Sequence, residues 1–189
     1  MSLTEQRLFE KKIAFNSAPA LCGIKCACLL SLDSEEFDVR GNADIFNSKA
    51  ACRGIEMRLL CSCGRRVLIM VFQRGLLRAQ LENKRVRALL SGYGYSPALD
   101  TDACLDRLSE RIKNGGGFPH EIGLFLGYPV DDVLGFIENG GENFKLCGCW
   151  KVYSDTESAE KTFRSFERCR EYLCSKLNRG LDIYQALGI

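Results

Sequence analysis

The chain of 189 residues has the length of one ordinary domain, and with 46% hydrophobic and 26% charged residues it can bury a core without disulfides or metals. Its net charge of +2 at pH 7 argues against general binding to nucleic acid, which requires a strongly basic surface. The longest apolar run, residues 19–32, is interrupted by Lys25 and is too short to span a membrane.

The cysteine content indicates the compartment. The N-terminus has no basic region followed by an apolar stretch, so we expect no secretion signal. Eleven cysteines, an odd number at irregular spacings, argue against a disulfide framework. The sequence therefore predicts a cytoplasmic protein with reduced thiols.

Period-two alternation predicts strands at residues 24–32 and 55–63. Each would carry apolar side chains and cysteines on one face: Ile24, Cys26, Cys28, Leu30 and Leu32 in the first, and Ile55, Met57, Leu59, Cys61 and Cys63 in the second. A Gly64-Arg65 turn leads into residues 66–73, which are apolar on both faces and predict a central, buried strand.

A last strand is predicted at residues 143–153. Its apolar face would hold Phe144, Leu146, Trp150 and Val152, and its polar face Lys145, Cys147, Cys149, Lys151 and Tyr153. The aromatic side chains of this region, Phe136, Phe144 and Trp150, are interpreted as core residues.

Helices are predicted at about residues 4–15, 42–51, 75–82, 83–90, 102–113, 119–126 and 129–138, followed by a long C-terminal helix and a short one at 181–187. Capping signals are Ser2 with Glu5, Asn42, Asn83, and Ser154 with Glu157. Pro19, the glycines at 115–117 and Gly180 are predicted helix stops. The fold class is a single α+β domain, residues 1–189, with a small, mostly antiparallel sheet of about four strands covered by helices and a helical insertion before the last strand.

Several motifs resemble one protein family. They are FPHEIGLFLGYP at residues 118–129, GFIEN at 135–139, WKVY at 150–153 and APALCGIK at 18–25. Together they resemble a bacterial family known as domain of unknown function 3793, and the resemblance covers nearly the whole chain. It departs from the family pattern at Cys149, where a tyrosine is usual, and at Cys26 and Cys28. The family implies no activity and no mechanism.

Three Cys-x-Cys pairs are candidate metal or redox sites: Cys26/Cys28, Cys61/Cys63 and Cys147/Cys149. Alternate strand residues share a face, so each pair would offer two thiolates to zinc or an iron–sulfur cluster. The first two pairs lie on apolar predicted faces, where thiols behave as small hydrophobic groups. Only Cys147/Cys149 shares a face with polar residues, and a structural role is the favoured interpretation for all three pairs.

His120 and Glu121 are candidates for acid–base chemistry or ligand binding. His120 is the only histidine in the chain, and a histidine beside a carboxylate can act as a general base. In the alternative, Glu121 stabilises the first turn of a helix and His120 bonds a nearby loop.

Residues 122–136 have the spacing of a helix-turn-helix. Gly123 would lie where two helices cross closely, with Val133 on the inner face of the second helix, and Ile122, Leu126 and Phe136 would fill the core. The presumed recognition helix carries Asp131, Asp132 and Glu138, which would repel phosphates. We therefore favour helix-pair packing without DNA binding.

The favoured hypothesis is a small-molecule-binding or accessory domain whose site lies where residues 118–129 meet the last strand. Its candidate residues are His120, Glu121, Lys151 and Tyr153, with Lys25 and Asn143 as weaker candidates. For the lysines of the last strand, a solvated face or edge protection is the favoured interpretation. In the functional alternative they would bind an anionic ligand. The alternatives are a thiol or metal protein using Cys147/Cys149 and a nucleic-acid or protein-partner module using residues 119–138. No cofactor and no complete catalytic signature is identified.

Overall fold

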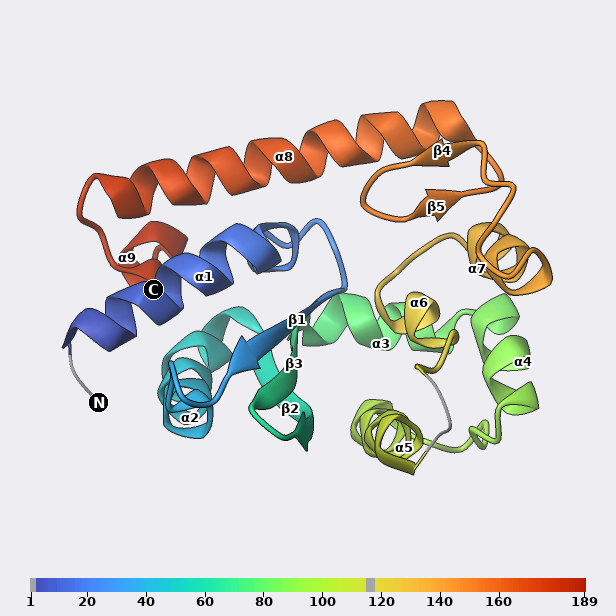
Figure 1. Cartoon of the computed structure of the whole chain (residues 1–189), viewed down its shortest axis with the longest axis horizontal. Helices are drawn as coiled ribbons and strands as arrows, with labels where there is room; N and C mark the ends of the chain where they lie inside the picture. Colours follow the sequence, from blue (N-terminus) through green and yellow to red (C-terminus); the bar gives the residue numbers. More distant parts are fainter. Residues whose placement is uncertain (1–2, 115–117) are drawn as a thin grey trace.

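The computed structural model describes residues 3–114 and 118–189 (Figure 1). Its strands are β1 (Ala27–Asp33), β2 (Ile55–Cys63), β3 (Arg66–Gln73), β4 (Leu146–Cys147) and β5 (Lys151–Val152). Its helices are α1 (Leu3–Leu21), α2 (Val39–Ala50), the 3-10 turn η1 (Ala51–Arg53), α3 (Arg74–Glu82), α4 (Lys84–Gly92), α5 (Thr101–Asn114), α6 (Ile122–Phe125), α7 (Val130–Glu138), α8 (Thr156–Asn178) and α9 (Ile183–Leu187). The α+β class is confirmed. The predicted Ser2 cap and the glycine stop at 115–117 lie outside the described residues.

The main sheet is antiparallel with the order β1-β3-β2, so the prediction of a central third strand is confirmed. Alternate residues of β3 enter two separate cores: Val67, Ile69 and Val71 on one face, Met70 and Phe72 on the other. The first core lies against α1, α2, α9 and the C-terminal half of α8, and the second against α3 to α7. Because β3 is buried on both faces, nearly all its residues are apolar.

A β-bulge in β2 corrects the predicted face of that strand. The pairing shifts between Leu59, opposite Ile69, and Cys61, opposite Leu68. The extra residue, Leu60, enters the second core. An extra residue reverses the faces beyond it, so Cys61 faces away from the core that Leu59 contacts.

The first strand begins later than predicted, at Ala27. Ile24 is exposed, and Cys26 packs in the second core with its thiol donating to the Phe125 carbonyl at 3.2 Å. Cys28 pairs across from Val71, whose side chain belongs to the first core. The prediction that Cys26 and Cys28 share one face is therefore wrong.

The predicted last strand is instead a short hairpin. Strand β4 turns at residues 148–150 and pairs antiparallel with β5, with Leu146 opposite Val152, in a sheet separate from the main one. Figure 1 shows this hairpin beneath the N-terminal half of α8 and beside α7. Because the chain reverses between them, Cys147 and Cys149 are not alternate residues of one strand.

The first helix passes through Pro19 and ends at Leu21, well beyond its predicted end at about residue 15. Proline has no N–H, so the helix bond from residue 19 to the Phe15 carbonyl cannot form. Arg170 of α8 donates Nε–H to that carbonyl at 3.0 Å, and its guanidinium lies 4.9 Å from the Phe15 ring. A contact from another helix thus compensates for a local defect.

Two predicted caps differ from the observed ones, and one is confirmed. Asn83 caps α4 by accepting from the N–H groups of residues 85 and 86, as expected. Helix α2 is capped by Asp38 rather than Asn42. Helix α8 is capped by Asp155, because the hydroxyl of Ser154 is bound to Asp132 instead.

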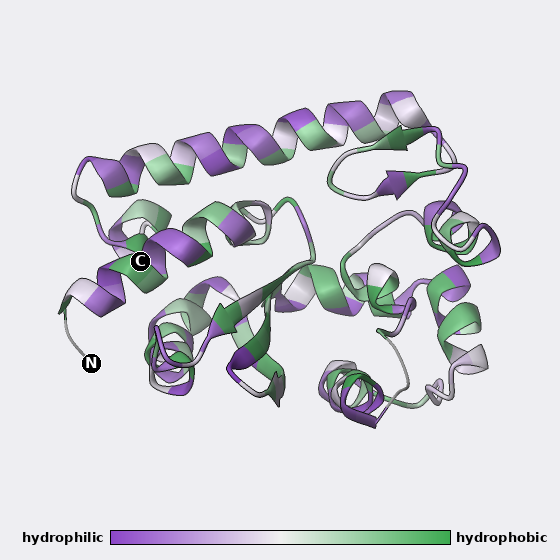
Figure 2. Cartoon of the chain, in the orientation of Figure 1, coloured by the Kyte–Doolittle hydropathy of each residue, from purple (hydrophilic) through white to green (hydrophobic). Residues whose placement is uncertain are grey.

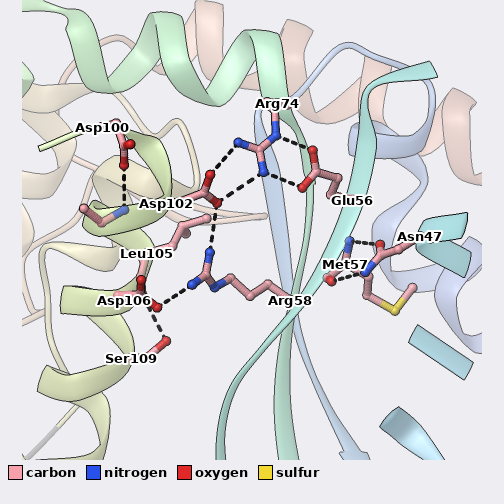
Figure 3. Close-up of polar contacts among 11 residues, drawn as sticks. Asn47, Glu56, Met57, Arg58, Arg74, Asp100, Asp102, Leu105, Asp106 and Ser109 are labelled. Atoms are coloured by element: carbon pink, nitrogen blue, oxygen red, sulfur yellow. Dashed lines mark hydrogen bonds and ion pairs between the residues drawn. The ribbon is translucent and has the colours of Figure 1, made fainter. Parts of the chain in front are cut away.

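A network of charged side chains fastens α5 to the edge of the main sheet (Figure 3). Asp102 of α5 accepts from Arg58 of β2 and from Arg74 at the start of α3. Arg58 also pairs with Asp106, and Arg74 with Glu56. Every charged group in the network is paired with an opposite charge. The network therefore has a structural role: it joins the second core to the sheet.

The free edge of β2 is closed by Asn47 of α2 (Figure 3). Its side-chain amide donates to the Met57 carbonyl at 2.8 Å and accepts from the Met57 N–H at 2.7 Å. This pair of bonds imitates a neighbouring strand, which protects the edge from pairing with another chain.

Candidate functional site

Helices α6 and α7 cross closely at Gly123, as the sequence predicts. A Cβ atom at this position would lie only 2.9 Å from Cγ2 of Val133. Residues Ile122, Leu126 and Val133 are buried around the crossing, and Phe136 is half-buried at its margin. The helix-turn-helix spacing therefore reflects tight packing of two short helices.

Asp132 joins this helix pair to the β4–β5 hairpin. The side chain is buried, and its two oxygens accept four hydrogen bonds from the hairpin segment. One oxygen accepts from the N–H groups of Tyr153 and Ser154 at 2.8 Å and from the Ser154 hydroxyl at 2.7 Å. The other accepts from the indole N–H of Trp150 at 2.7 Å. The carboxylate thus fixes the hairpin against α7.

A cavity of about 280 Å³ lies between the helix pair and the hairpin. Apolar and aromatic side chains form most of its wall. The lining residues are Phe118, Pro119, His120, Ile122, Gly123, Leu126, Tyr128, Asp132, Val133, Phe136, Trp150 and Lys151. The volume is close to the lower end, about 300 Å³, of the usual range for small-molecule sites.

Two flat rings form one wall of the cavity. Tyr128 and Trp150 are stacked, with their centroids 5.1 Å apart and their planes 27° apart. Phe163 of α8 contacts Trp150 edge-on, with the ring centroids 4.6 Å apart. The pKa of Tyr128 is raised to about 12, chiefly by burial and next by the neighbouring Cys28, so its hydroxyl stays protonated at neutral pH.

Among the predicted site residues, His120 and Lys151 lie together on this cavity. His120 is exposed at the rim, with its ring 5.3 Å from that of Phe136. Lys151, in β5, is half-buried, and its ammonium donates to the Gly141 carbonyl at 2.6 Å. The turn before α6 and the β4–β5 hairpin thus each supply one polar group.

Glu121 points away from the cavity, although it is adjacent to His120 in the chain. Its side chain is 1% exposed and forms an ion pair with Arg111 of α5. The Tyr95 hydroxyl lies 3.4 Å from the same carboxylate, and burial, followed by the Glu121 charge, raises the Tyr95 pKa. Glu121 therefore anchors the start of α6 to α5, and Arg111 is the partner that sequence reasoning missed.

The remaining candidate residues lie around the cavity without lining it. Tyr153 packs against Gly135, where a Cβ would be 2.5 Å from the tyrosine side chain. Lys25 lies on the other side of the stacked rings, with its ammonium 5.0 Å from the centroid of Tyr128, and lines a second hollow of about 260 Å³. Asn143 is exposed and has a positive φ of 57°.

The aromatic residues assigned to the core from sequence have mixed positions. Trp150 and Phe136 are half-buried and line the cavity, whereas Phe144 is 38% exposed. The prediction of a buried Phe144 is wrong because residues 143–145 precede the short hairpin and do not enter a long buried strand.

The cysteine pairs differ in how much their thiols are exposed. Cys147 and Cys149 are both exposed residues. The thiol of Cys149 is nevertheless partly shielded from water, which raises its pKa. Burial also raises the pKa of Cys26, to about 11. Within residues 3–114 and 118–189, no group of three or more histidine, cysteine or carboxylate side chains is placed to hold a metal ion.

Asp132 is the main residue of this region that sequence analysis misjudged. Its charge suggested a solvent-facing side of a recognition helix, whereas it faces inward and Asp131 faces solvent, paired with Arg85 at 2.6 Å. Its position could have indicated burial, because Asp132 directly precedes the inward-facing Val133. Its hydrogen-bond donors could not be predicted, because they lie about twenty residues further along the chain.

Fold and site define an α+β structure with a largely apolar cavity between a helix pair and a hairpin. The chain belongs to the family described as protein of unknown function DUF3793, whose model matches residues 13–187. No curated protein and no solved structure matches the chain. In the described ranges, no helix combines the length and apolar character needed to cross a membrane.

Proposed function

We propose that the protein binds a small, largely apolar molecule in the cavity between the α6–α7 pair and the β4–β5 hairpin. The observation that carries the proposal is the composition of the wall. Eight of the lining side chains are apolar or aromatic without a charge, and they surround the polar groups of His120 and Lys151. Apolar walls with a few placed polar groups are typical of small-molecule sites.

The packing around the cavity supports this proposal. Contiguous apolar surface that is open to solvent is uncommon on a folded chain and often marks a binding site. Here close contacts surround the space: Gly123 against Val133, Gly135 against Tyr153, and Asp132 bonded to the hairpin. A hollow bordered by such tight packing fits a site that a ligand fills.

Two alternative functions remain. One is a thiol or metal function of Cys147/Cys149, and the other is a nucleic-acid or partner role of residues 119–138. Neither has an observation in its favour comparable to the composition of the cavity wall. A cytoplasmic location is supported by the eleven free cysteines, an odd number that suits a reducing compartment.

A titration with N-phenyl-1-naphthylamine tests binding to the cavity. This neutral dye becomes fluorescent in apolar surroundings. It consists of a naphthalene ring system joined through an amine to a phenyl ring. We expect saturable binding of one dye per chain. Ile122→Phe, which adds volume to the cavity wall, should weaken that binding by about tenfold or more, since steric overlap replaces a favourable contact.

Leu76→Phe is the matched control, because Leu76 is 41% exposed and lines the second hollow instead. It should leave the dye affinity unchanged. Circular dichroism and thermal unfolding establish that both variants fold. Dye binding that is unsaturable, or that responds equally to both substitutions, would contradict the proposal.

A further inference from the structure

We propose that the ligand of this cavity is a flat apolar molecule carrying one anionic group, such as a carboxylate or sulfonate, and that Lys151 binds this group. The inference rests on the proposed function, since it names the class of ligand for the same cavity. It is carried by the bonding state of Lys151 and by the charges around the aromatic rings.

Lys151 has unused hydrogen-bonding capacity at the cavity. An ammonium carries three N–H donors, and the Gly141 carbonyl accepts one of them at 2.6 Å. Lys151 forms no ion pair with any described residue. A half-buried cation without a carboxylate partner favours an anion supplied from outside the chain.

Aromatic rings fix the position of this ammonium. Nζ lies 4.9 Å from the ring centroid of Phe144 and 5.9 Å from that of Phe136. Such contacts stabilise a cation while excluding water from around it. A charge-assisted bond from Lys151 to an incoming anion is therefore stronger than it would be in open solvent.

The same surroundings disfavour a cationic ligand. One of the lining rings, Phe136, already has a cation beside it, because Nζ of Lys151 lies 5.9 Å from its centroid. The one lining carboxylate, Asp132, already accepts four hydrogen bonds from the hairpin segment. A cation would meet the like charge of Lys151 there.

The shape of the wall indicates a flat molecule. Four aromatic side chains line the cavity: Phe118, Tyr128, Phe136 and Trp150. Ring faces pack best against other flat groups, in offset-stacked or edge-on arrangements. A planar ring system with one acidic substituent therefore matches both the wall and Lys151.

Two dyes with the same ring system separate the charge from the apolar part. N-phenyl-1-naphthylamine is neutral, and 8-anilino-1-naphthalenesulfonate adds one sulfonate to it. Lys151→Met keeps the aliphatic stem and removes the charge. We expect it to weaken binding of the sulfonate dye by about tenfold or more and to change binding of the neutral dye by less than about threefold.

Lys145→Met is the matched control in the same segment. Lys145 is exposed, bonds the Ser154 carbonyl at 3.0 Å and does not line the cavity. It should alter neither affinity. An effect of Lys151→Met that is equal for both dyes, or no effect on either, would overturn the anion assignment while leaving cavity binding intact.

Binding of neither dye to the unsubstituted chain would overturn the proposed function, and with it this inference. If Lys151→Met does not fold, Lys151→Gln provides the test, because glutamine also removes the positive charge. It should weaken binding of the sulfonate dye by about tenfold or more and change binding of the neutral dye by less than about threefold. The two dyes are also compared on the unsubstituted chain. If the neutral dye bound tenfold more tightly than the sulfonate dye, the sulfonate would have no cationic partner in the cavity, and the inference would be refuted.

Discussion

At the scale of single residues, Asp132 is the side chain on which the shape of the cavity depends most. It is 2% exposed and accepts hydrogen bonds from Trp150, Tyr153 and Ser154. Every donor it meets comes from the hairpin segment, so the carboxylate positions Trp150 and, through the backbone, Lys151. Asp132 is therefore a positioning residue for the proposed site.

Asp132→Asn should lower the free energy of unfolding by about 2–4 kcal/mol. The amide replaces one accepting oxygen by an NH₂ group that faces other donors, which leaves buried groups unsatisfied. Urea unfolding measures the change. Asp131→Asn, at the neighbouring exposed position paired with Arg85, should cost much less, because solvent screens an exposed ion pair. Equal losses in the two variants would contradict the role assigned to Asp132.

At the scale of elements, α1 and α8 are joined where Pro19 leaves the Phe15 carbonyl without its helical donor. Arg170 supplies that donor. Arg170→Met should lower the free energy of unfolding by about 0.5–1.5 kcal/mol, because it removes one hydrogen bond. In a Pro19→Ala background, the alanine N–H restores the helical bond.

The double-mutant cycle therefore has a clear expectation. Arg170→Met should cost at most half as much in the Pro19→Ala chain as in the unsubstituted chain, with the remainder due to the contact between Arg170 and the Phe15 ring. Chemical denaturation of the four proteins gives the coupling. Additive effects would mean that Arg170 does not compensate for the proline.

The attachment of α5 to the sheet should depend on pH in a definite direction. Hydrogen bonds from Arg74, and its charge, lower the pKa of Asp102 below the usual 3.8, outweighing the effect of burial. The ionised carboxylate thus contributes stability above about pH 4, and this contribution is lost as the pH falls through the lowered pKa.

Asp102→Asn should accordingly destabilise the protein by about 1 kcal/mol or less at pH 7, since the pair is partly exposed. The difference from the unsubstituted chain should shrink as the pH is lowered below about 4. Thermal unfolding across this pH range measures it. A difference that grows on acidification would contradict the assignment of the ion pair.

Local sequence patterns predicted the helices and strands better than they predicted which distant residues the side chains contact. The apolar run of β3 and the small residue at Gly123 carry their meaning within a few residues, and both predictions are confirmed. The bulge at Leu60, the ion pair of Glu121 with Arg111 and the bonds of Asp132 depend on segments distant in the chain. Alternation alone could not show that residues 143–153 reverse direction, because short hairpins and single strands share that pattern.

At the scale of the whole molecule, two cores lie on opposite faces of one sheet, and the cavity lies at the outer margin of the second core. In Figure 2 the central strands are mostly hydrophobic, whereas α8 alternates between hydrophilic and hydrophobic residues along its length. Helix α8 connects the parts: its N-terminal half contacts Trp150, and its C-terminal half contacts α1 and α9. Helix α8 therefore links the first core to the wall of the cavity.

Trp150 provides the most direct test of cavity binding, because it is the only tryptophan in the chain and forms part of the cavity wall. A ¹H–¹⁵N correlation spectrum should therefore contain one indole N–H signal. Addition of N-phenyl-1-naphthylamine should shift this signal progressively until one dye is bound per chain, and Ile122→Phe should greatly reduce the shift at the same dye concentration. If the dye binds while the indole signal stays unmoved, the ligand lies elsewhere and the cavity is not the binding site.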